Sequence, residues 1–273
     1  MNSVFNRLLI LALVLVTLPL ARSQDVRIAV DHASRLAPYF EIRIPPGSGP
    51  FPAMIMVTGC SGFHSERFAR SYDRDGDLFV ELGYAVARAD FVRAHGLENS
   101  CSSDENVTGE IVPNTEIAKY IFATVAHMVA RSDVDSDRVY LIGWSLGGTG
   151  IIVAMTNNEL LTGRNIAGVL NYFPGCDDVT PWTAEVPMLL MLAELDNIKR
   201  PQYCRELVQN SPKKGLIKVI EYSDSHHCFT AEDTAVVTEP RSKPTCAYNP
   251  EAHRASWRKR PFQAVIPIVR ISV

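Results

Sequence analysis

The sequence predicts an α/β fold in which a mostly parallel central sheet is covered by helices on both faces. Short β-rich runs alternate along the chain with stretches whose apolar residues recur at helical spacing. The chain is also 47% hydrophobic and 21% charged, which supplies a sizeable core and differs from the composition of disordered chains. Alternation of this kind is typical of parallel sheets whose strands are connected by helices.

The first half of the chain predicts three strands. Residues 39–44 form the first, and residues 52–58 form a buried strand because they are an unbroken apolar run. A helix at about residues 66–82 leads to a third strand at residues 84–91. A long polar loop then follows at residues 93–114.

The second half repeats the alternation. A helix is predicted at about residues 115–131, where Ile117, Ile121 and Val125 recur on one helical face. The remaining strands are expected at 138–144, 166–173, 186–195 and 216–222, and the remaining helices at 147–157 and about 202–209. No internal repeat or linker separates these elements, so they predict one domain. Ligands of such sheets bind beyond the carboxyl ends of the strands.

Residues 1–23 have the pattern of a secretory signal peptide. A short polar start with Arg7 precedes an apolar run at residues 8–18, and Pro19 and a small-residue cleavage pattern follow. The run is too short to span a membrane. We therefore expect a single mature domain of 250 residues, 24–273, that is exported to the periplasm or secreted and has no membrane attachment.

The net charge limits the class of partner that is expected, and the cysteines indicate the cellular compartment. The formal net charge is −3, or −5 without the two arginines of residues 1–23, and no basic run indicates nucleic-acid binding. A small-molecule partner is therefore expected. All the cysteines lie in the expected mature part, and an even number in an oxidising compartment predicts three disulfides. They are Cys60, Cys101, Cys176, Cys204, Cys228 and Cys246.

A G-x-S-x-G motif provides the candidate nucleophile. Gly143-Trp144-Ser145-Leu146-Gly147 stands between a predicted strand and a predicted helix. Its glycines permit a tight turn that lifts Ser145 above the sheet, and the helix N-terminus faces developing negative charge. We therefore predict that Ser145 is a nucleophile.

A serine nucleophile needs a histidine base and a carboxylate that orients it, and in this architecture the chain order is Ser, Asp or Glu, His. Asp196 follows the strand expected at 186–195, and His226 and His227 follow the strand expected at 216–222. Position favours Asp196 over three other carboxylates. Adjacent loop residues point in opposite directions, so only one of the two histidines can serve. The competing carboxylates are Asp177, Asp178 and Glu194.

Other residues give weaker signals. His64, His226, His227 and Cys228 lack the spacing of a metal site, so no metal and no cofactor are expected. Cys60 and Cys228 are alternative nucleophiles, but neither stands in the motif and export favours their oxidation. Five large side chains could line a substrate pocket or belong to the core. They are Phe63, His64, Trp144, Phe173 and Trp182.

Taken together, these residues resemble the exported branch of the dienelactone hydrolase family, within the α/β-hydrolase superfamily. The matching segments extend over nearly the whole mature chain, and the family's Y-x-x-A-x-H-x-F spacing matches Tyr222, His227 and Phe229. The resemblance thereby selects His227 as base and favours Asp196 as acid. The other matching segments are Gly59-Cys60-Ser61-Gly62, Gly83-Tyr84-Ala85-Val86, Asp137-Arg138-Val139, Gly143 to Gly148 and Tyr172 to Cys176.

The resemblance also implies details of the site. The amides of Cys60 and Leu146 would form the oxyanion hole. The implied disulfides are Cys60–Cys101, Cys176–Cys204 and Cys228–Cys246. The enzymes that name the family have cysteine at the position of Ser145, so dienelactone itself is not implied.

We predict a serine hydrolase that acts on a small carboxylic ester or lactone through an acyl-enzyme. The same residues would also suit an amidase, a peptidase or an acyltransferase. A noncatalytic binding protein that keeps the fold is the third hypothesis. The sequence does not indicate an oligomeric state.

Overall fold

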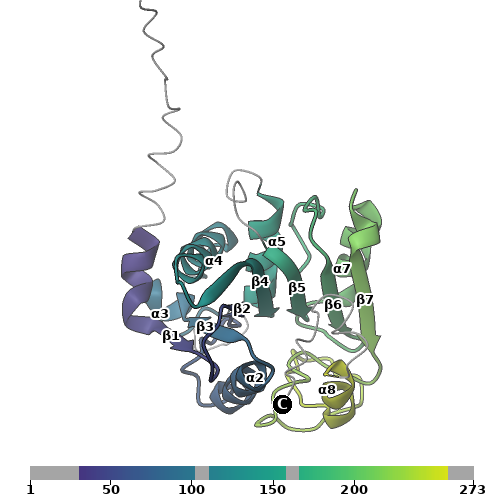
Figure 1. The fold of residues 1–273 in the computed structure, drawn as a ribbon. Coiled ribbons are helices and arrows are strands. Elements are labelled where there is room, and N and C mark those ends of the chain that lie inside the picture. Colours follow the sequence, from purple (N-terminus) through teal and green to yellow (C-terminus); the bar gives the residue numbers. More distant parts are fainter. Residues whose placement is uncertain (1–30, 102–110, 158–165, 258–273) are drawn as a thin grey trace, which may run out of the picture.

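Seven strands form one sheet in the order β1-β3-β2-β4-β5-β6-β7 (Figure 1). The computed structural model describes residues 31–101, 111–157 and 166–257. The strands are β1 (Phe40–Arg43), β2 (Phe51–Val57), β3 (Ala85–Ala89), β4 (Val134–Trp144), β5 (Ile166–Tyr172), β6 (Met188–Ala193) and β7 (Ile217–Tyr222). The helices are η1 (Ala37–Tyr39), α2 (Ala69–Glu81), α3 (Phe91–Ala94), α4 (Asn114–Val129), α5 (Leu146–Thr156), α7 (Pro201–Asn210), η2 (Lys214–Leu216) and α8 (Pro250–Ser256).

The sheet is mostly parallel, which confirms the predicted fold class. Among the strands of the described residues, only β1 pairs antiparallel, with β3, and every other neighbouring pair is parallel. The carboxyl ends of the parallel strands therefore meet at one edge of the sheet. The loops that follow β2, β4, β6 and β7 all begin there, so this edge can collect groups from distant parts of the sequence.

The predicted strands and the longer helices are present, with ends that shift by a few residues. Two short helices were not predicted, α3 and α8, because four and seven residues are too few to give a periodic pattern. Both begin at a side-chain cap: Asp90 Oδ1 accepts from Arg93 N, and Asn249 Oδ1 accepts from Ala252 N. The predicted signal peptide, residues 1–23, lies outside the described residues.

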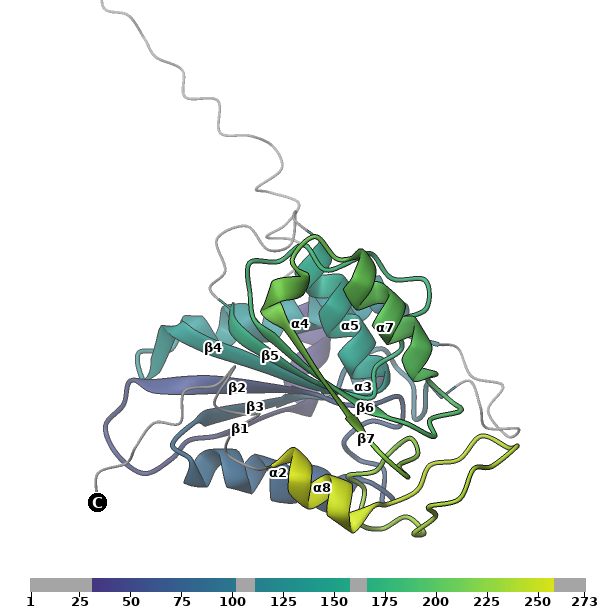
Figure 2. The same ribbon diagram turned by 90° about the vertical axis from the view of Figure 1, so that its right-hand side faces the viewer.

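Helices cover both faces of the sheet (Figure 2). Helices α3, α4, α5 and α7 lie on one face, and α2 and α8 lie on the other. The period-two alternation of a strand divides the buried side chains between them. In β4, for example, Val139 and Leu141 join the cluster on the first face, whereas Tyr140 and Trp144 join the cluster on the second.

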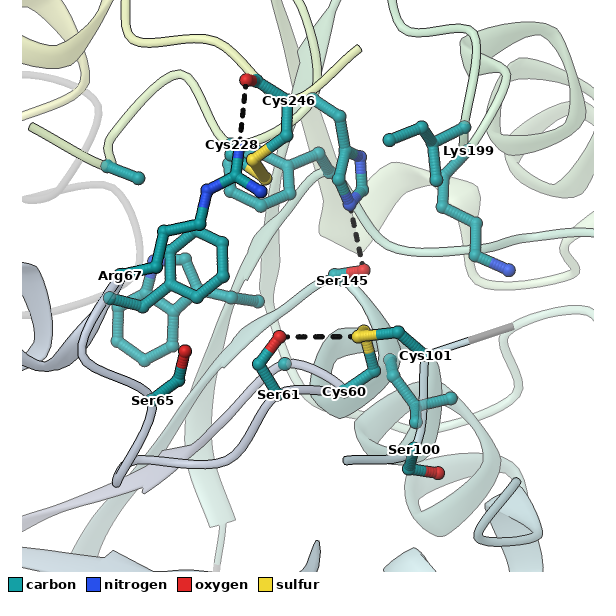
Figure 3. Close-up of a pocket in the computed structure, with 18 of the residues that line it drawn as sticks. Cys60, Ser61, Ser65, Arg67, Ser100, Cys101, Ser145, Lys199, Cys228 and Cys246 are labelled. Carbon is teal, nitrogen blue, oxygen red and sulfur yellow. Dashed lines mark hydrogen bonds between the residues drawn. A yellow bond between two sulfur atoms is a disulfide. The ribbon is translucent and has the colours of Figure 1, made fainter. Parts of the chain in front are cut away.

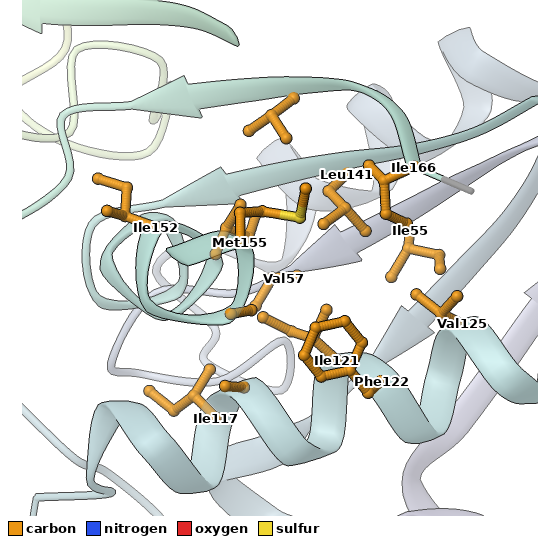
Figure 4. Packing of buried hydrophobic residues seen from close by; sticks show 14 of the residues in the cluster. Ile55, Val57, Ile117, Ile121, Phe122, Val125, Leu141, Ile152, Met155 and Ile166 are labelled. Atoms are coloured by element: carbon orange, nitrogen blue, oxygen red, sulfur yellow. The ribbon is translucent and has the colours of Figure 1, made fainter. Parts of the chain in front are cut away.

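We call the first side the aliphatic face, because branched aliphatic side chains fill the space between the sheet and helices α4 and α5 (Figure 4). Ile117 and Ile121 of α4 point toward Val57 of β2 and Ile152 of α5. We call the second side the aromatic face. Its cluster includes Tyr72, Phe79, Tyr84, Tyr140, Trp144, Tyr172, Phe173, Tyr222 and Phe229.

Candidate active site

Ser145 stands at the sharp turn between β4 and α5. Its backbone has φ 50° and ψ −117°, a conformation that L-residues seldom adopt, and it lifts the side chain out of the sheet. The flanking glycines are required by close approach. A Cβ on Gly143 would lie 2.8 Å from Gly148 Cα, and a Cβ on Gly147 would lie 2.2 Å from the Thr58 carbonyl oxygen. The motif therefore fits this turn only with glycine at both positions.

A hydrogen-bonded chain connects Ser145, His227 and Asp196. His227 Nε2 is 2.9 Å from Ser145 Oγ, and His227 Nδ1 is 2.7 Å from Asp196 Oδ2. An ionised carboxylate can only accept, so Nδ1 donates to Asp196 and leaves Nε2 to accept the serine proton. The structure thus brings the three predicted residues together.

Asp196 is fixed by the loop that carries it. Its Oδ1 accepts from the amides of Ile198 at 2.9 Å and Lys199 at 2.7 Å, which leaves Oδ2 for His227. The loop is joined to the histidine loop because Leu195 N donates to Ser225 O at 2.8 Å. Both His227 and Asp196 are buried, so the hydrogen bond between them is shielded from water.

The other candidate histidine and carboxylates lie outside this hydrogen-bonded chain. His226 is fully buried and bonds through Nε2 to Glu239 O at 2.8 Å. Glu194 accepts from Asp224 N at 3.1 Å. Asp177 and Asp178 line a separate hollow beside α7. None of these four residues contacts Ser145 in the described part of the chain.

The loop after β2 faces the nucleophile. A Cβ on Gly59 would lie 3.7 Å from Ser145 Cβ, so the loop packs closely against Ser145. Gly62 N donates to Gly59 O at 3.2 Å and closes a tight turn that includes Cys60. Leu146 is the first residue of α5, so its amide has no intrahelical acceptor. The two amides expected at the oxyanion hole thus belong to the loop after β2 and to the first turn of α5.

Three disulfides connect the loops of the site to neighbouring segments. They are Cys60–Cys101, Cys176–Cys204 and Cys228–Cys246, the pairs that the resemblance implies. Cys60 belongs to the loop after β2, and Cys228 follows His227 directly. A disulfide that closes a loop typically stabilises a protein by about 2–4 kcal/mol.

A cavity of about 800 Å³ opens over Ser145 and His227. Of the five predicted lining candidates, Trp144 and Phe173 line it, whereas Trp182 is fully buried in the core of the aliphatic face. In Figure 3, Arg67 and Lys199 lie on opposite sides of Ser145. The other lining side chains are mixed, with polar residues such as Ser61 and Asn99 and apolar residues such as Phe68 and Ile198.

Three lining residues of one segment are not predicted from the sequence: Arg67, Tyr72 and Asp75. Asp75 is buried, and burial raises its pKa to about 6 although Arg74 bonds to it. Nothing in the local sequence marks these residues, because their proximity to Ser145 arises from the packing of α2 on the sheet. Their only sequence signal is the predicted helix at 66–82.

The described residues contain no group of three or more His, Cys, Asp or Glu side chains suited to a metal ion. None of the described helices combines the length and the apolar character needed to cross a membrane.

Comparison with known proteins agrees with this architecture. The model of the dienelactone hydrolase family matches residues 41–262. A putative dienelactone hydrolase from Klebsiella pneumoniae subsp. pneumoniae has a similar structure, with a TM-score of 0.64 and 15% identity over 83% of this chain and 91% of that one. A dienelactone hydrolase-like promiscuous phosphotriesterase from metagenomic libraries is also similar, with a TM-score of 0.60 and 19% identity over 80% of this chain and 87% of that one. No curated protein matches the sequence.

Proposed function

Because the chain belongs to the dienelactone hydrolase family, we propose that this hydrolase cleaves carboxylic esters or lactones with Ser145 as its nucleophile. The observation that carries the proposal is the hydrogen-bonded chain from Ser145 Oγ through His227 to Asp196, with distances of 2.9 and 2.7 Å. This chain supplies the base that a serine hydroxyl needs in order to attack a carbonyl carbon.

In the first half of the reaction, Ser145 Oγ attacks the carbonyl carbon and its proton passes to His227 Nε2. The imidazolium that forms is stabilised by the Asp196 carboxylate, which accepts from Nδ1. The carbonyl oxygen becomes an oxyanion, which the amides of Cys60 and Leu146 bind. The leaving alkoxide then takes the proton from His227 Nε2, and the acyl group remains on Ser145.

Water completes the cycle. His227 Nε2 takes a proton from a water molecule as the water oxygen attacks the acyl carbon, and the same two amides bind the second oxyanion. Collapse of this intermediate breaks the bond to Ser145 Oγ, which recovers its proton from His227. All the required groups belong to the protein, so the proposed cycle includes no cofactor.

We also propose that the active form is the exported, oxidised chain that begins at Gln24. The signal-peptide pattern of residues 1–23 and the three disulfides support this proposal, since such bonds persist in oxidising compartments. N-terminal sequencing of protein recovered from the periplasm or medium tests it. A mature N-terminus at Met1, or free thiols in that protein, would contradict it.

Active-site labelling tests the nucleophile. A fluorophosphonate probe should label the oxidised protein once, and Ser145→Ala should abolish both the labelling and ester hydrolysis. The matched control is Ser136→Ala, which changes an exposed serine at the other end of β4. Labelling that persists in Ser145→Ala would refute the proposal, and an unlabelled folded parent would favour the binding-protein hypothesis.

The acid is tested by replacing each candidate carboxylate. Asp196→Asn should lower kcat by about 10⁴-fold, because the amide cannot hold His227 in the required tautomer. Asp177→Asn and Glu194→Gln should leave kcat unchanged, since neither carboxylate contacts His227 in the described residues. Equal activity of Asp196→Asn and its parent would remove Asp196 from the mechanism.

The substrate class is tested with matched substrates. A panel of esters of increasing chain length, the corresponding amides and a lactone should show hydrolysis of the esters or the lactone with much slower cleavage of the amides. An added alcohol acceptor separates hydrolysis from acyl transfer. Preferential formation of a new ester would identify an acyltransferase instead.

A further inference from the structure

Tyr72 of α2 contacts both sides of the candidate oxyanion hole. Its hydroxyl oxygen accepts a hydrogen bond from Gly59 N at 3.0 Å. Its ring packs edge-on against Trp144, with ring centroids 5.1 Å apart, and against Phe63, with centroids 4.9 Å apart. Trp144 precedes Ser145, whereas Phe63 follows the loop after β2. Tyr72 therefore lies between the nucleophile's strand and the loop that faces it.

The hydrogen bonds of this loop leave the Cys60 amide without an acceptor. Gly59 N donates to Tyr72, Gly59 O accepts from Gly62 N at 3.2 Å, and Cys60 O accepts from Ser100 N at 2.8 Å. The Cys60 amide donates to no acceptor among the described residues, and neither does the amide of Ser61. Because Gly59 O and Cys60 N belong to one peptide plane and point in opposite directions, the bond from Gly62 also fixes the direction of the Cys60 N–H.

From these contacts we infer that Tyr72 is a positioning residue, which holds Gly59 so that the Cys60 amide is aimed at the oxyanion. This inference rests on the proposed function. Without the hydroxyl, the Gly59 end of the turn would lose its side-chain anchor, although the disulfide and the Ser100 bond would still hold the Cys60 end. Loss of the hydroxyl should therefore misplace the Cys60 N–H donor without unfolding the loop.

The position also requires a neutral hydroxyl. Burial raises the pKa of Tyr72, so the phenol keeps its proton at neutral pH. A phenolate at this place would repel the oxyanion that forms on the substrate. A neutral phenol oxygen orients Gly59 without adding a charge near the reacting carbonyl group.

Helix α2 itself is held on the opposite side by the histidine loop. Ser71 Oγ accepts from Glu232 N at 3.2 Å, and Arg70 forms an ion pair with Asp233 at 2.9 Å. Arg74 also donates to Thr230 O at 3.3 Å. These contacts surround Tyr72 on the helix, so its hydroxyl is presented from a fixed support.

The test compares Tyr72→Phe with Tyr140→Phe in the oxidised mature protein. Tyr72→Phe keeps the ring but removes the acceptor, and Tyr140→Phe removes a hydroxyl from the same aromatic cluster on β4, away from the loop. With the best ester of the panel, we expect kcat of Tyr72→Phe to fall by about 10- to 100-fold while KM changes less than about threefold. This is smaller than the roughly 10²- to 10³-fold loss of a whole oxyanion donor. Tyr140→Phe should keep the parent kcat.

An oxyanion mimic supplies a readout that a merely structural role would not change. When Ser145 Oγ adds to a trifluoromethyl ketone, the Oγ–carbon bond forms, the carbonyl π electrons move to the oxygen and the serine proton goes to His227 Nε2. The inhibition constant of Tyr72→Phe should rise by the same factor as its kcat falls. The alcohol product of the same ester, which forms no oxyanion when it binds, should bind the variant and the parent equally.

Each outcome bears on one claim. The role of Tyr72 is overturned if Tyr72→Phe has the same kcat and inhibition constant as Tyr140→Phe while the probe labels Ser145. That result would leave the proposed function intact. Failure of Ser145 labelling in the parent counts against the proposed function itself. Should Tyr72→Phe fail to fold, Tyr72→Met, which keeps the apolar volume, is measured against the same two constants.

Discussion

The aliphatic and aromatic faces cover the same sheet with different side chains. Aromatic residues make up 4 of the 35 buried residues in the cluster of the aliphatic face but 9 of the 18 in the cluster of the aromatic face. On the aromatic face, these rings lead to the site: Phe229 contacts Phe173, whose ring centroid lies 4.8 Å from that of His227. Large rings there both fill the core and contact His227 of the proposed active site. The aliphatic face packs on the other side of the sheet.

The largest expected effect comes from the place where the aliphatic face meets the site. Gly147→Ala should prevent stable folding, because its Cβ would lie 2.2 Å from the Thr58 carbonyl oxygen and 2.4 Å from that of Val57, both backbone atoms of the adjoining strand and loop. Circular dichroism and the soluble yield measure this. The control is Gly215→Ala, whose Cβ would meet nothing within 4 Å. A folded, active Gly147→Ala would show that α5 can move away from β2.

A pair of core truncations separates the two faces. Ile121→Ala on the aliphatic face should lower the free energy of unfolding by about 2–5 kcal/mol, and Phe229→Ala on the aromatic face by about 3–5 kcal/mol. Below their melting temperatures, we expect kcat to stay unchanged in Ile121→Ala and to fall in Phe229→Ala, because Phe173 loses its support. Urea denaturation and steady-state kinetics measure the two quantities. Equal kcat values in Ile121→Ala and Phe229→Ala would contradict the expected difference in function between the two faces.

The acid sensitivity of the fold should arise partly on the aromatic face. Burial, with smaller contributions from Arg74 and Arg254, lowers the pKa of His253 on α8 from 6.5 to about 3. Between pH 6.5 and 3 the unfolded chain takes up a proton that the folded chain does not, so stability falls as the pH drops, by up to about 1.4 kcal/mol per pH unit.

This contribution is isolated by subtraction. Asp75, whose pKa is raised to about 6 by burial, acts with the opposite sign between about pH 4 and 6, because there the folded chain holds the extra proton. The free energy of unfolding of His253→Gln is therefore compared with that of the parent at each pH, and the exposed His127→Gln on α4 is the control. Parallel pH curves for all three proteins would contradict the assignment to His253.

The smallest expected effect lies at the rim of the aliphatic face. Arg205 of α7 bonds to both carboxylate oxygens of Glu221 on β7, each at 2.8 Å, but the pair is partly exposed. Water screens such pairs, so Arg205→Gln should change the free energy of unfolding by about 0–1 kcal/mol. A loss above about 2 kcal/mol in urea denaturation would mean that the rim of this face contributes as much as its core.

The two faces also differ in how far the sequence predicts them. Helix α4 has a periodic apolar pattern that requires no knowledge of its partners, and the turn at Ser145 is marked by its glycines. Tyr72 is one of nine tyrosines, and only the crossing of α2 over the sheet brings it to Gly59. The choice of His227 over His226 and the cysteine pairing came from the family resemblance. Contacts between distant segments depend on tertiary packing, which local patterns do not encode.

Adjacent strands carry the two halves of the proposed catalytic site. β2 and β4 pair directly, and their carboxyl ends carry Cys60 and Ser145, whereas β6 and β7 pair directly and are followed by Asp196 and His227. Neighbouring strands lie about 4.8 Å apart because of backbone hydrogen bonding. The spacing of the reacting groups is therefore largely a property of the main chain. The connecting segments that line the cavity can then differ in length and sequence, or be exchanged by loop grafting. The strand ends would still hold the proposed catalytic groups at the same spacing.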